Sequence, residues 1–377
     1  MSMKKYHLYL WLLVLVGLVT SCSQDDNADM LQTTDSNTVR ITASLPADFA
    51  QIGTRALPSA DGHQLRCIIE VWTQDASPVL KYREEKARTT GENLTFEFKI
   101  DDGTYDCLFW ADFIRTDAES SEATLGGFTY THYSDRYYMT NTDGGLKGIA
   151  INSTLYASAF NTDNRDAFFS CEVLEKKVGK NGTLTAKLTR PFAKLTVKEK
   201  TAEAFALCKT MTAKYTVPWK FNVLTGTTVG TLNVSYNAAP AGNGTGDLTL
   251  FSDYILTASA TRETLGDIKL TFTKQDAAEK ELQPVTIPAG VPVQRNYKTN
   301  ASGSLISAEP DATDKATVTV TMDAEWATSE DDVDLDAKVG DSFTSTAHGR
   351  QTLTGAIPAS ASSSRSMLTE GAERLCR

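Results

Sequence analysis

The sequence has few of the residues on which most enzymes and metal proteins depend. Only four of its 377 residues are histidines, at positions 7, 63, 132 and 348, and no two of these are close in sequence. It contains no HExxH, GxSxG or glycine-rich phosphate-binding motif. Only carboxylate chemistry stays open, because two acids on distant strands leave no motif. The sequence therefore predicts a protein that is not an enzyme and that has no cofactor and no metal site.

The net charge, the apolar runs and the spacing of the cysteines argue against further classes of protein. The formal net charge of −10 argues against binding to nucleic acid and against electrostatic binding to membranes, since both need basic patches. The longest apolar run, residues 8–19, is shorter than the roughly 20 residues that a spanning helix needs. No CxxC pair occurs, so we expect the cysteines after Cys22 to be buried small side chains, with one disulfide left open; they are Cys67, Cys107, Cys171, Cys208 and Cys376.

The N-terminus has the features of an export signal. Lys4 and Lys5 precede the apolar run, and the residues VTSC that end at Cys22 resemble a bacterial lipobox. We therefore expect residues 1–21 to be a lipoprotein signal peptide and Cys22 to carry the lipid that anchors the chain in the outer membrane. The residues QDD at 24–26 resemble a surface-export signal. An ordinary secretory signal with an incidental cysteine is the alternative.

Alternation of apolar and polar residues recurs along the chain and predicts half-buried strands in antiparallel sheets. Clear examples are residues 39–45, 65–71, 94–100, 169–173, 184–188, 193–197, 268–272 and 316–322. Turn sequences rich in Gly, Asn and Asp separate them, and one short helix is expected near residues 202–211. The fold class is all-β: residues 22–38 form a polar tether, 39–189 an N-terminal β-sandwich, 190–327 a C-terminal β-sandwich and 328–377 a polar tail expected to be disordered.

Several short runs together resemble the fimbrillin family of Bacteroidetes pili. They are the lipobox at Cys22, the strand VRITASL followed by GTRA at 53–56, DAFF at 166–169, RPFAKLTV at 190–197 and VPVQRNYKTN at 291–300. The resemblance implies two transthyretin-like β-sandwich domains and export as a lipoprotein. It also implies trimming by an Arg-specific protease, here between Arg55 and Ala56. The chain departs from the family at its end, where about fifty residues follow the last expected strand.

The resemblance also implies a fimbrial (pilus) subunit or a fimbria-associated adhesin whose partners are other fimbrial subunits. Loss of residues 39–45 leaves an unpaired strand edge that recruits another chain. A strand from the next subunit then fills it, and the candidate donor side chains are Ala316, Val318, Val320 and Met322. Donor and acceptor lie on different surfaces, so the contacts are head-to-tail. The alternative from another class is a monomeric outer-membrane surface lipoprotein that binds glycan or nutrient.

Two other segments are candidate sites. Residues 128–139 form an aromatic loop that is a candidate adhesive contact with a host or bacterial receptor, and its rings are Phe128, Tyr130, Tyr133, Tyr137 and Tyr138. A long loop pinned by its own aromatic rings is the favoured alternative. The acidic residues at 331, 332, 334 and 336 are the right type for calcium, but no glycine supplies the turn of an EF-hand, so a solvated tail is favoured.

Overall fold

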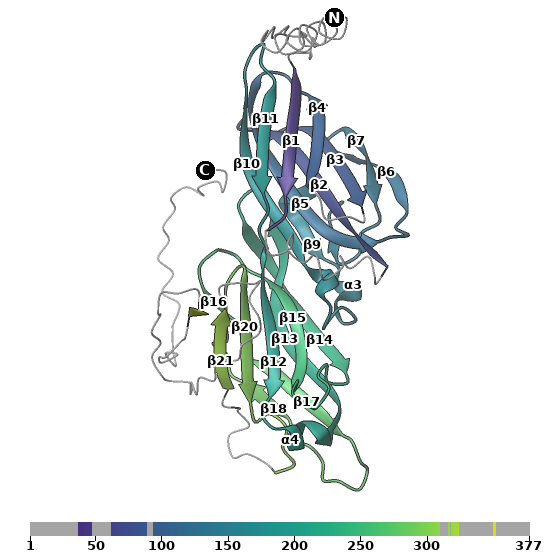
Figure 1. Cartoon of the computed structure of the whole chain (residues 1–377), viewed down its shortest axis with the longest axis vertical. Helices are drawn as coiled ribbons and strands as arrows, with labels where there is room; N and C mark the ends of the chain where they lie inside the picture. The colour runs from purple at the N-terminus through teal and green to yellow at the C-terminus, as the bar shows by residue number, and fades with distance from the viewer. Residues whose placement is uncertain are drawn as a thin grey trace, which may run out of the picture.

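The computed structural model describes residues 37–46, 62–88, 93–309, 316 and 318–323, and the backbone of residues 350–351. These residues form an all-β protein, which confirms the predicted fold class (Figure 1). The strands before residue 190 are β1 (Thr38–Ser44), β2 (His63–Thr73), β3 (Leu80–Arg88), β4 (Leu94–Lys99), β5 (Gly103–Arg115), β6 (Ser120–Leu125), β7 (Phe128–Tyr133), β8 (Tyr138–Met139), β9 (Ile149–Ile151), β10 (Ala167–Lys176) and β11 (Gly182–Lys187).

The strands after residue 190 and the short helices complete the element list. The strands are β12 (Phe192–Glu199), β13 (Cys208–Asn222), β14 (Thr227–Ala238), β15 (Thr249–Leu256), β16 (Glu263–Thr264), β17 (Ile268–Lys274), β18 (Val285–Ile287), β19 (Pro292–Val293), β20 (Tyr297–Gly303), β21 (Val318–Asp323) and β22 (Arg350–Gln351). The helices are η2 (Gly145–Gly148), α3 (Ser153–Tyr156), η3 (Asp163–Arg165) and α4 (Ala202–Leu207), the last of which was expected from the sequence.

Two sheets form a sandwich at the N-terminal end of the molecule. One has the strand order β11-β1-β4 and the other β10-β5-β2-β3. The inward residues of these strands together form one apolar core that includes Val39, Ile41, Phe96, Phe109 and Phe113. The hairpin β6-β7 lies beside β3 at the edge of this sandwich (Figure 1).

The second body is built on two larger sheets. Their strand orders are β15-β12-β20-β21-β22 and β18-β17-β13-β9-β8, and β14 pairs with β13. β8 and β9 precede residue 190 in the chain, yet β9 joins the second sheet by pairing Ile149 with Phe221 of β13. Backbone pairing therefore crosses the position where the sequence predicts a domain boundary, and that boundary stays a prediction.

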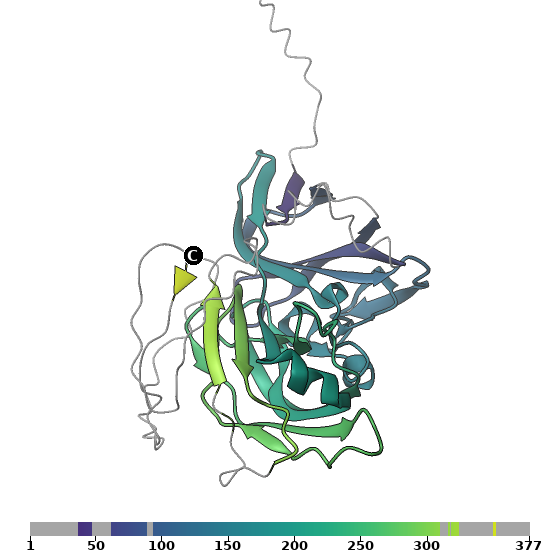
Figure 2. The same ribbon diagram turned by 60° about the horizontal axis from the view of Figure 1, so that its bottom comes forward.

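The two bodies pack directly on each other (Figures 1 and 2). β2, β5 and β10 use their inward faces for the first core, and their opposite faces meet the second body. An aromatic cluster fills this junction: the ring centroids of Trp110 and Tyr138 are 5.3 Å apart, and those of Phe169 and Phe221 are 4.8 Å apart. Aromatic pairs at such distances contribute about 0.5–1.5 kcal/mol beyond their buried area. The buried apolar side chains of the junction and of the second body form one continuous core.

The first strand of each body occupies the same place in its sheet. β1 pairs parallel with β11 and antiparallel with β4, while β12 pairs parallel with β20 and antiparallel with β15. The sequences match as well, since VRITA at 39–43 corresponds to AKLTV at 193–197. The expectation of purely antiparallel sheets is wrong for these two parallel pairs. They arise because each first strand lies beside a strand that comes much later in the chain. The alternation of apolar and polar residues does not reveal which strands pair over such distances.

Three of the cysteines have the predicted environment. Cys67, Cys107 and Cys208 are buried free thiols, and burial raises the pKa of Cys67 to about 12 and that of Cys208 to about 11. Cys171 is also buried, as expected, and it is disulfide-bonded, an alternative that the cysteine spacing had left open. Within the described residues, no helix has the length and apolar character needed to cross a membrane.

Candidate functional site: the first strand, the C-terminal edge strand and the buried ion network

β1 occupies a slot inside its sheet, between β4 and β11. Val39, Ile41 and Ala43 point into the sandwich core, and their exposed fractions are 0%, 0% and 3%. The opposite face of β1 is polar, where Arg40 lies 3.3 Å from Glu97 of β4 and both side chains are mostly exposed. Both backbone edges of β1 are paired, with β11 from Val39 to Ser44 and with β4 from Thr38 to Ala43. We call this space, bounded by β4 and β11, the β1 slot.

Strand β21 carries three of the four candidate donor residues, and Ala316 precedes it. This strand pairs antiparallel with β20, where Val320 is opposite Ala301, and in the described part of the chain its other edge pairs with the two residues of β22. Ala316, Val318, Val320 and Met322 are buried, with exposed fractions between 1% and 7%. The candidate donor strand is therefore docked within its own chain, and it has one full-length neighbour where β1 has two.

The residues expected to be lipidated or cleaved lie outside the described part of the chain. They are Cys22, Arg55 and Ala56, and the acidic residues at 331, 332, 334 and 336 lie outside it as well. The strands on either side nevertheless show which parts of the fold the candidate cleavage site connects. The Arg55–Ala56 bond lies between β1 and β2, which belong to opposite sheets of the sandwich. A cut there leaves β1 attached to the rest of the described chain by non-covalent contacts alone.

The aromatic segment at 128–139 consists of β7, a short connection and β8, so the prediction of a loop is wrong, although buried rings pin the segment as the favoured alternative expected. Residues 128–133 form β7, and Tyr130, Tyr137 and Tyr138 are buried. Phe128 and Tyr133 are half-buried. The hydroxyl of Tyr138 donates to the carbonyl of Arg165, which holds its ring in the junction between the bodies. Three of the five rings therefore have no free face, which removes the basis for adhesive contact through them.

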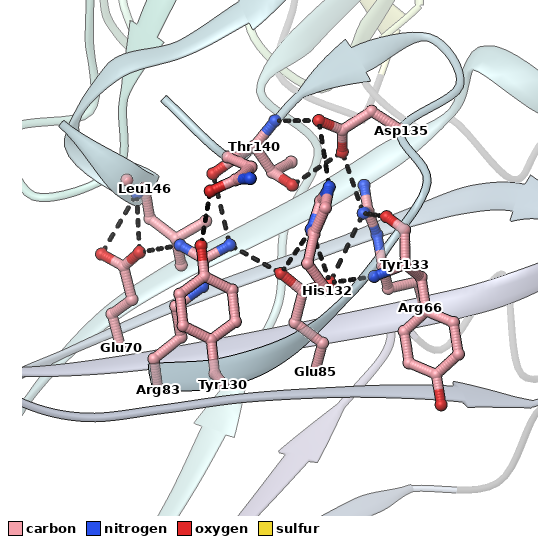
Figure 3. A network of polar contacts seen from close by, with 12 residues as sticks. Arg66, Glu70, Arg83, Glu85, Tyr130, His132, Tyr133, Asp135, Thr140 and Leu146 are labelled. Atoms are coloured by element: carbon pink, nitrogen blue, oxygen red, sulfur yellow. Dashed lines mark hydrogen bonds and ion pairs between the residues drawn. The ribbon is translucent and has the colours of Figure 1, made fainter. Parts of the chain in front are cut away.

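A buried network of ion pairs lies against β7 (Figure 3). Arg66 of β2 is one of the two arginines in this network. Its guanidinium donates to both carboxylate oxygens of Asp112 at 2.9 and 2.7 Å. It also donates to the carbonyl of Tyr133 at 2.9 Å and lies 2.9 Å from the carboxylate of Asp135. Asp112 is on β5, whereas Tyr133 ends β7. Arg66 thus joins the hairpin to the sheet beneath it.

Arg83 of β3 is the second cation. It donates to Glu70 and, at 2.7 Å, to Glu85, and it reaches the carbonyl of Thr140 at 3.2 Å (Figure 3). Glu70 in turn accepts the backbone N–H of Leu146 at 3.1 Å. Both Arg83 and Glu70 are fully buried as side chains. Because a lone charge in such a place would cost several kcal/mol, the pairing accounts for how these charges are tolerated.

β7 covers this network. The ring of Tyr130 lies 4.3 Å from the Arg83 guanidinium, and His132 Nδ1 is 3.1 Å from Glu85. Phe128, Tyr130 and His132 alternate with the exposed Thr129 and Thr131, so a strand signal was present in the sequence. The network has no open face in the described residues, and no group of His, Cys, Asp and Glu there has the arrangement of a metal site. Its geometry indicates a structural role.

Glu85 should give the network a defined pH dependence. Burial alone would raise its pKa, but the hydrogen bond to His132 and the charges of Arg66 and Arg83 outweigh burial and lower it to about 2. The unfolded chain titrates Glu85 near 4.5, so its contribution is complete above pH 4.5 and is lost as the pH falls toward 2. The stability advantage of wild type over Glu85→Gln should therefore shrink by about 3 kcal/mol between pH 5 and pH 2.

The measurement is urea unfolding of both proteins at stepped pH. The exposed Glu97→Gln serves as control, because a surface ion pair contributes about 0–1 kcal/mol. A constant difference between wild type and Glu85→Gln across this range would contradict the assignment. Burial raises the pKa of Glu70 and Asp112, which act in the opposite direction, so the difference between variants is the informative quantity rather than the absolute stability.

These features define an all-β protein of two joined bodies whose first strand fills an internal slot. The chain belongs to a family of unknown function, DUF6562, whose model matches residues 32–348. No curated protein matches the sequence.

The chain is similar to solved structures of several Bacteroides species and of Porphyromonas gingivalis. A candidate polysaccharide-binding protein of Bacteroides thetaiotaomicron has a TM-score of 0.43 and 10% identity, covering 76% of this chain and 96% of that one. The fimbrial anchor protein Mfa2 of Porphyromonas gingivalis has a TM-score of 0.39 and 10% identity over 76% and 96%. The tip fimbrial protein Mfa3 of the same organism has a TM-score of 0.38 and 11% identity over 76% and 98%. None of these descriptions names an enzyme.

Proposed function

We propose that this protein is a surface-exported lipoprotein, anchored through Cys22, that acts as a fimbrial subunit or a fimbria-associated adhesin. Its subunits join after Arg-specific cleavage between Arg55 and Ala56, when β1 leaves its slot and a strand of another subunit takes its place. The observation that carries the proposal is the position of β1. It is paired on both edges, it supplies core side chains, and its link to β2 is a segment that contains the candidate cleavage site.

We expect β21 to be more stable in the β1 slot of another subunit than in its own chain, because the slot offers it more neighbouring strands. Among the described residues of its own chain, β21 has one full-length neighbour, β20, and a two-residue pairing with β22. In the β1 slot, the same strand gains pairing with β4 and β11 together. Its alternating Val318, Val320 and Met322 match the alternation of Val39, Ile41 and Ala43. Main-chain hydrogen bonds then supply affinity, and the alternating side chains set the register.

Residues 23–377 treated with a low dose of an Arg-specific protease test the proposal. We expect one early product that begins at Ala56 and that assembles into ladders resistant to denaturant. Other arginines near this site are protected, because Arg40 lies in a strand paired on both edges and Arg66 is buried. The readouts are N-terminal sequencing and size in denaturant.

The control is Arg55→Lys, which removes the site for an Arg-specific protease but keeps the charge. This variant should stay uncut and should form no ladders. If the wild-type chain is cut after Arg55 and remains monomeric, strand exchange is wrong. A monomeric surface lipoprotein that binds glycan or nutrient would then be the better description.

A further inference from the structure

We infer that β14 is a second association surface, through which two copies of this chain pair edge to edge. β14 runs along the outer side of the second body (Figure 1). One of its edges pairs with β13 in a single register from Met211↔Ala238 to Asn222↔Thr227. In the described part of the chain, no strand pairs with the other edge. The backbone groups on that side are therefore available to another strand.

β14 lacks the devices that usually protect an edge strand. Natural sheets discourage edge pairing with charged residues, proline, bulges or very short strands. β14 has the sequence TTVGTLNVSYNA, which is 12 residues long and contains no charged residue and no proline. Its register with β13 shows no bulge. Gly230 has a φ of +71° and no ladder partner, so the regular stretch begins at Thr231.

Neutrality of this strand favours a second copy of the same chain as the partner. Two copies each carry a net charge of −10 and repel one another over most approaches. An edge without charge is a place where they can meet without a like-charge pair. The exposed residues next to the edge are small and polar, namely Thr231, Asn233, Ser235 and Asn237. Identical strands in antiparallel pairing form a closed two-fold contact, in which each surface is its own complement.

The pleat limits the registers that this pairing can adopt. Side chains opposite each other across antiparallel strands lie on the same face, so outward residues must face outward residues. A two-fold axis at any residue of β14 satisfies this condition, and we place the axis at Val234, near the centre of the regular stretch that begins at Thr231. It places Asn233 opposite Ser235 of the other copy and Leu232 opposite Tyr236. The inward face of β14 then continues as one apolar surface across the pair.

Contacts on the inward face of β14 fix its conformation in the monomer. Tyr236 stacks on Phe160 with ring centroids 4.3 Å apart, and its hydroxyl accepts a hydrogen bond from Asn161 at 2.7 Å. Val234 is buried. These contacts fix the strand before association, so little conformational entropy remains to be lost when a second copy adds.

A charge-swap series at Asn233 and Ser235 tests the inference, and it uses Arg55→Lys as background so that no cleavage is needed. Sedimentation equilibrium on the background protein should show a monomer–dimer equilibrium. Asn233→Glu with Ser235→Glu creates two like-charge pairs in the dimer and should weaken dimerisation by roughly tenfold. Asn233→Lys with Ser235→Glu places opposite charges across the same contact and should restore it.

The outcomes separate this surface from the proposed strand exchange. A background protein that stays monomeric at its highest soluble concentration would overturn the inference, while cleavage-dependent ladders remained open to test. Equal dimerisation by both double variants would also overturn it, because the register requires them to differ. Assembly into open-ended polymers would point to head-to-tail addition and against a two-fold pair. Thermal unfolding of each variant verifies that the monomer is intact.

Discussion

Replacement of Arg66 by methionine is expected to lower the free energy of unfolding by about 3–5 kcal/mol, since it leaves buried carboxylates without their counter-ion. Arg66 contacts Asp112 and Asp135 directly and lies 3.6 Å from Glu85, and its side chain is fully buried. Methionine fills a similar volume, so the change isolates the loss of charge and hydrogen bonds from the loss of packing. Urea unfolding followed by tryptophan fluorescence measures the effect.

The matched control is Arg40→Met, which removes an arginine from an ion pair whose two side chains are 64% and 57% exposed. Its expected cost is about 0–1 kcal/mol. The cost of Arg66→Met should also decrease at low pH. Burial already raises the pKa of Asp112, and loss of Arg66 raises it further, so the carboxyl takes up a proton more readily. Similar costs for the two methionine variants would show that the network contributes little.

This network also marks the limit of what the sequence reveals. The strand alternation predicted β1, β4, β12 and β21 to within a residue or two, because their inward residues are simply apolar. β3 reads LKYREEKAR, a run that resembles a solvent-exposed strand. In the folded chain its Arg83 and Glu85 are buried, since β7 supplies partners from more than forty residues away. Local pattern cannot anticipate burial of charges by distant partners.

For the β1 slot, the sequence predicted the strand but not its position in the sheet. The alternation in residues 39–45 predicted the strand, and the resemblance of nearby residues to fimbrillins predicted a processing site. They did not reveal that β1 lies in the middle of a sheet, parallel to β11. That placement depends on a pairing between residues about 140 positions apart along the chain, a separation at which hydrophobic period carries no information on partner or direction.

Replacement of Ile41 by aspartate should separate the two interpretations of β1, as an exchangeable strand or as a permanent part of the core. Ile41 is fully buried, so loss of its side chain and burial of a charge should together cost more than about 4 kcal/mol. If β1 is exchangeable, this cost should release the strand rather than unfold the whole chain. The slot should then bind a synthetic peptide of residues 37–46, measured by fluorescence anisotropy.

The neighbouring Arg40→Asp is the control, because it introduces the same residue on the exposed face of the same strand. It should keep β1 docked and bind no peptide. A peptide of residues 316–323 should compete with the first-strand peptide for the Ile41→Asp variant, since both have the same apolar alternation. Cooperative loss of structure in both bodies of Ile41→Asp would mean that β1 cannot be removed. Strand exchange through this slot would then be physically excluded, even if Arg55 is cleaved.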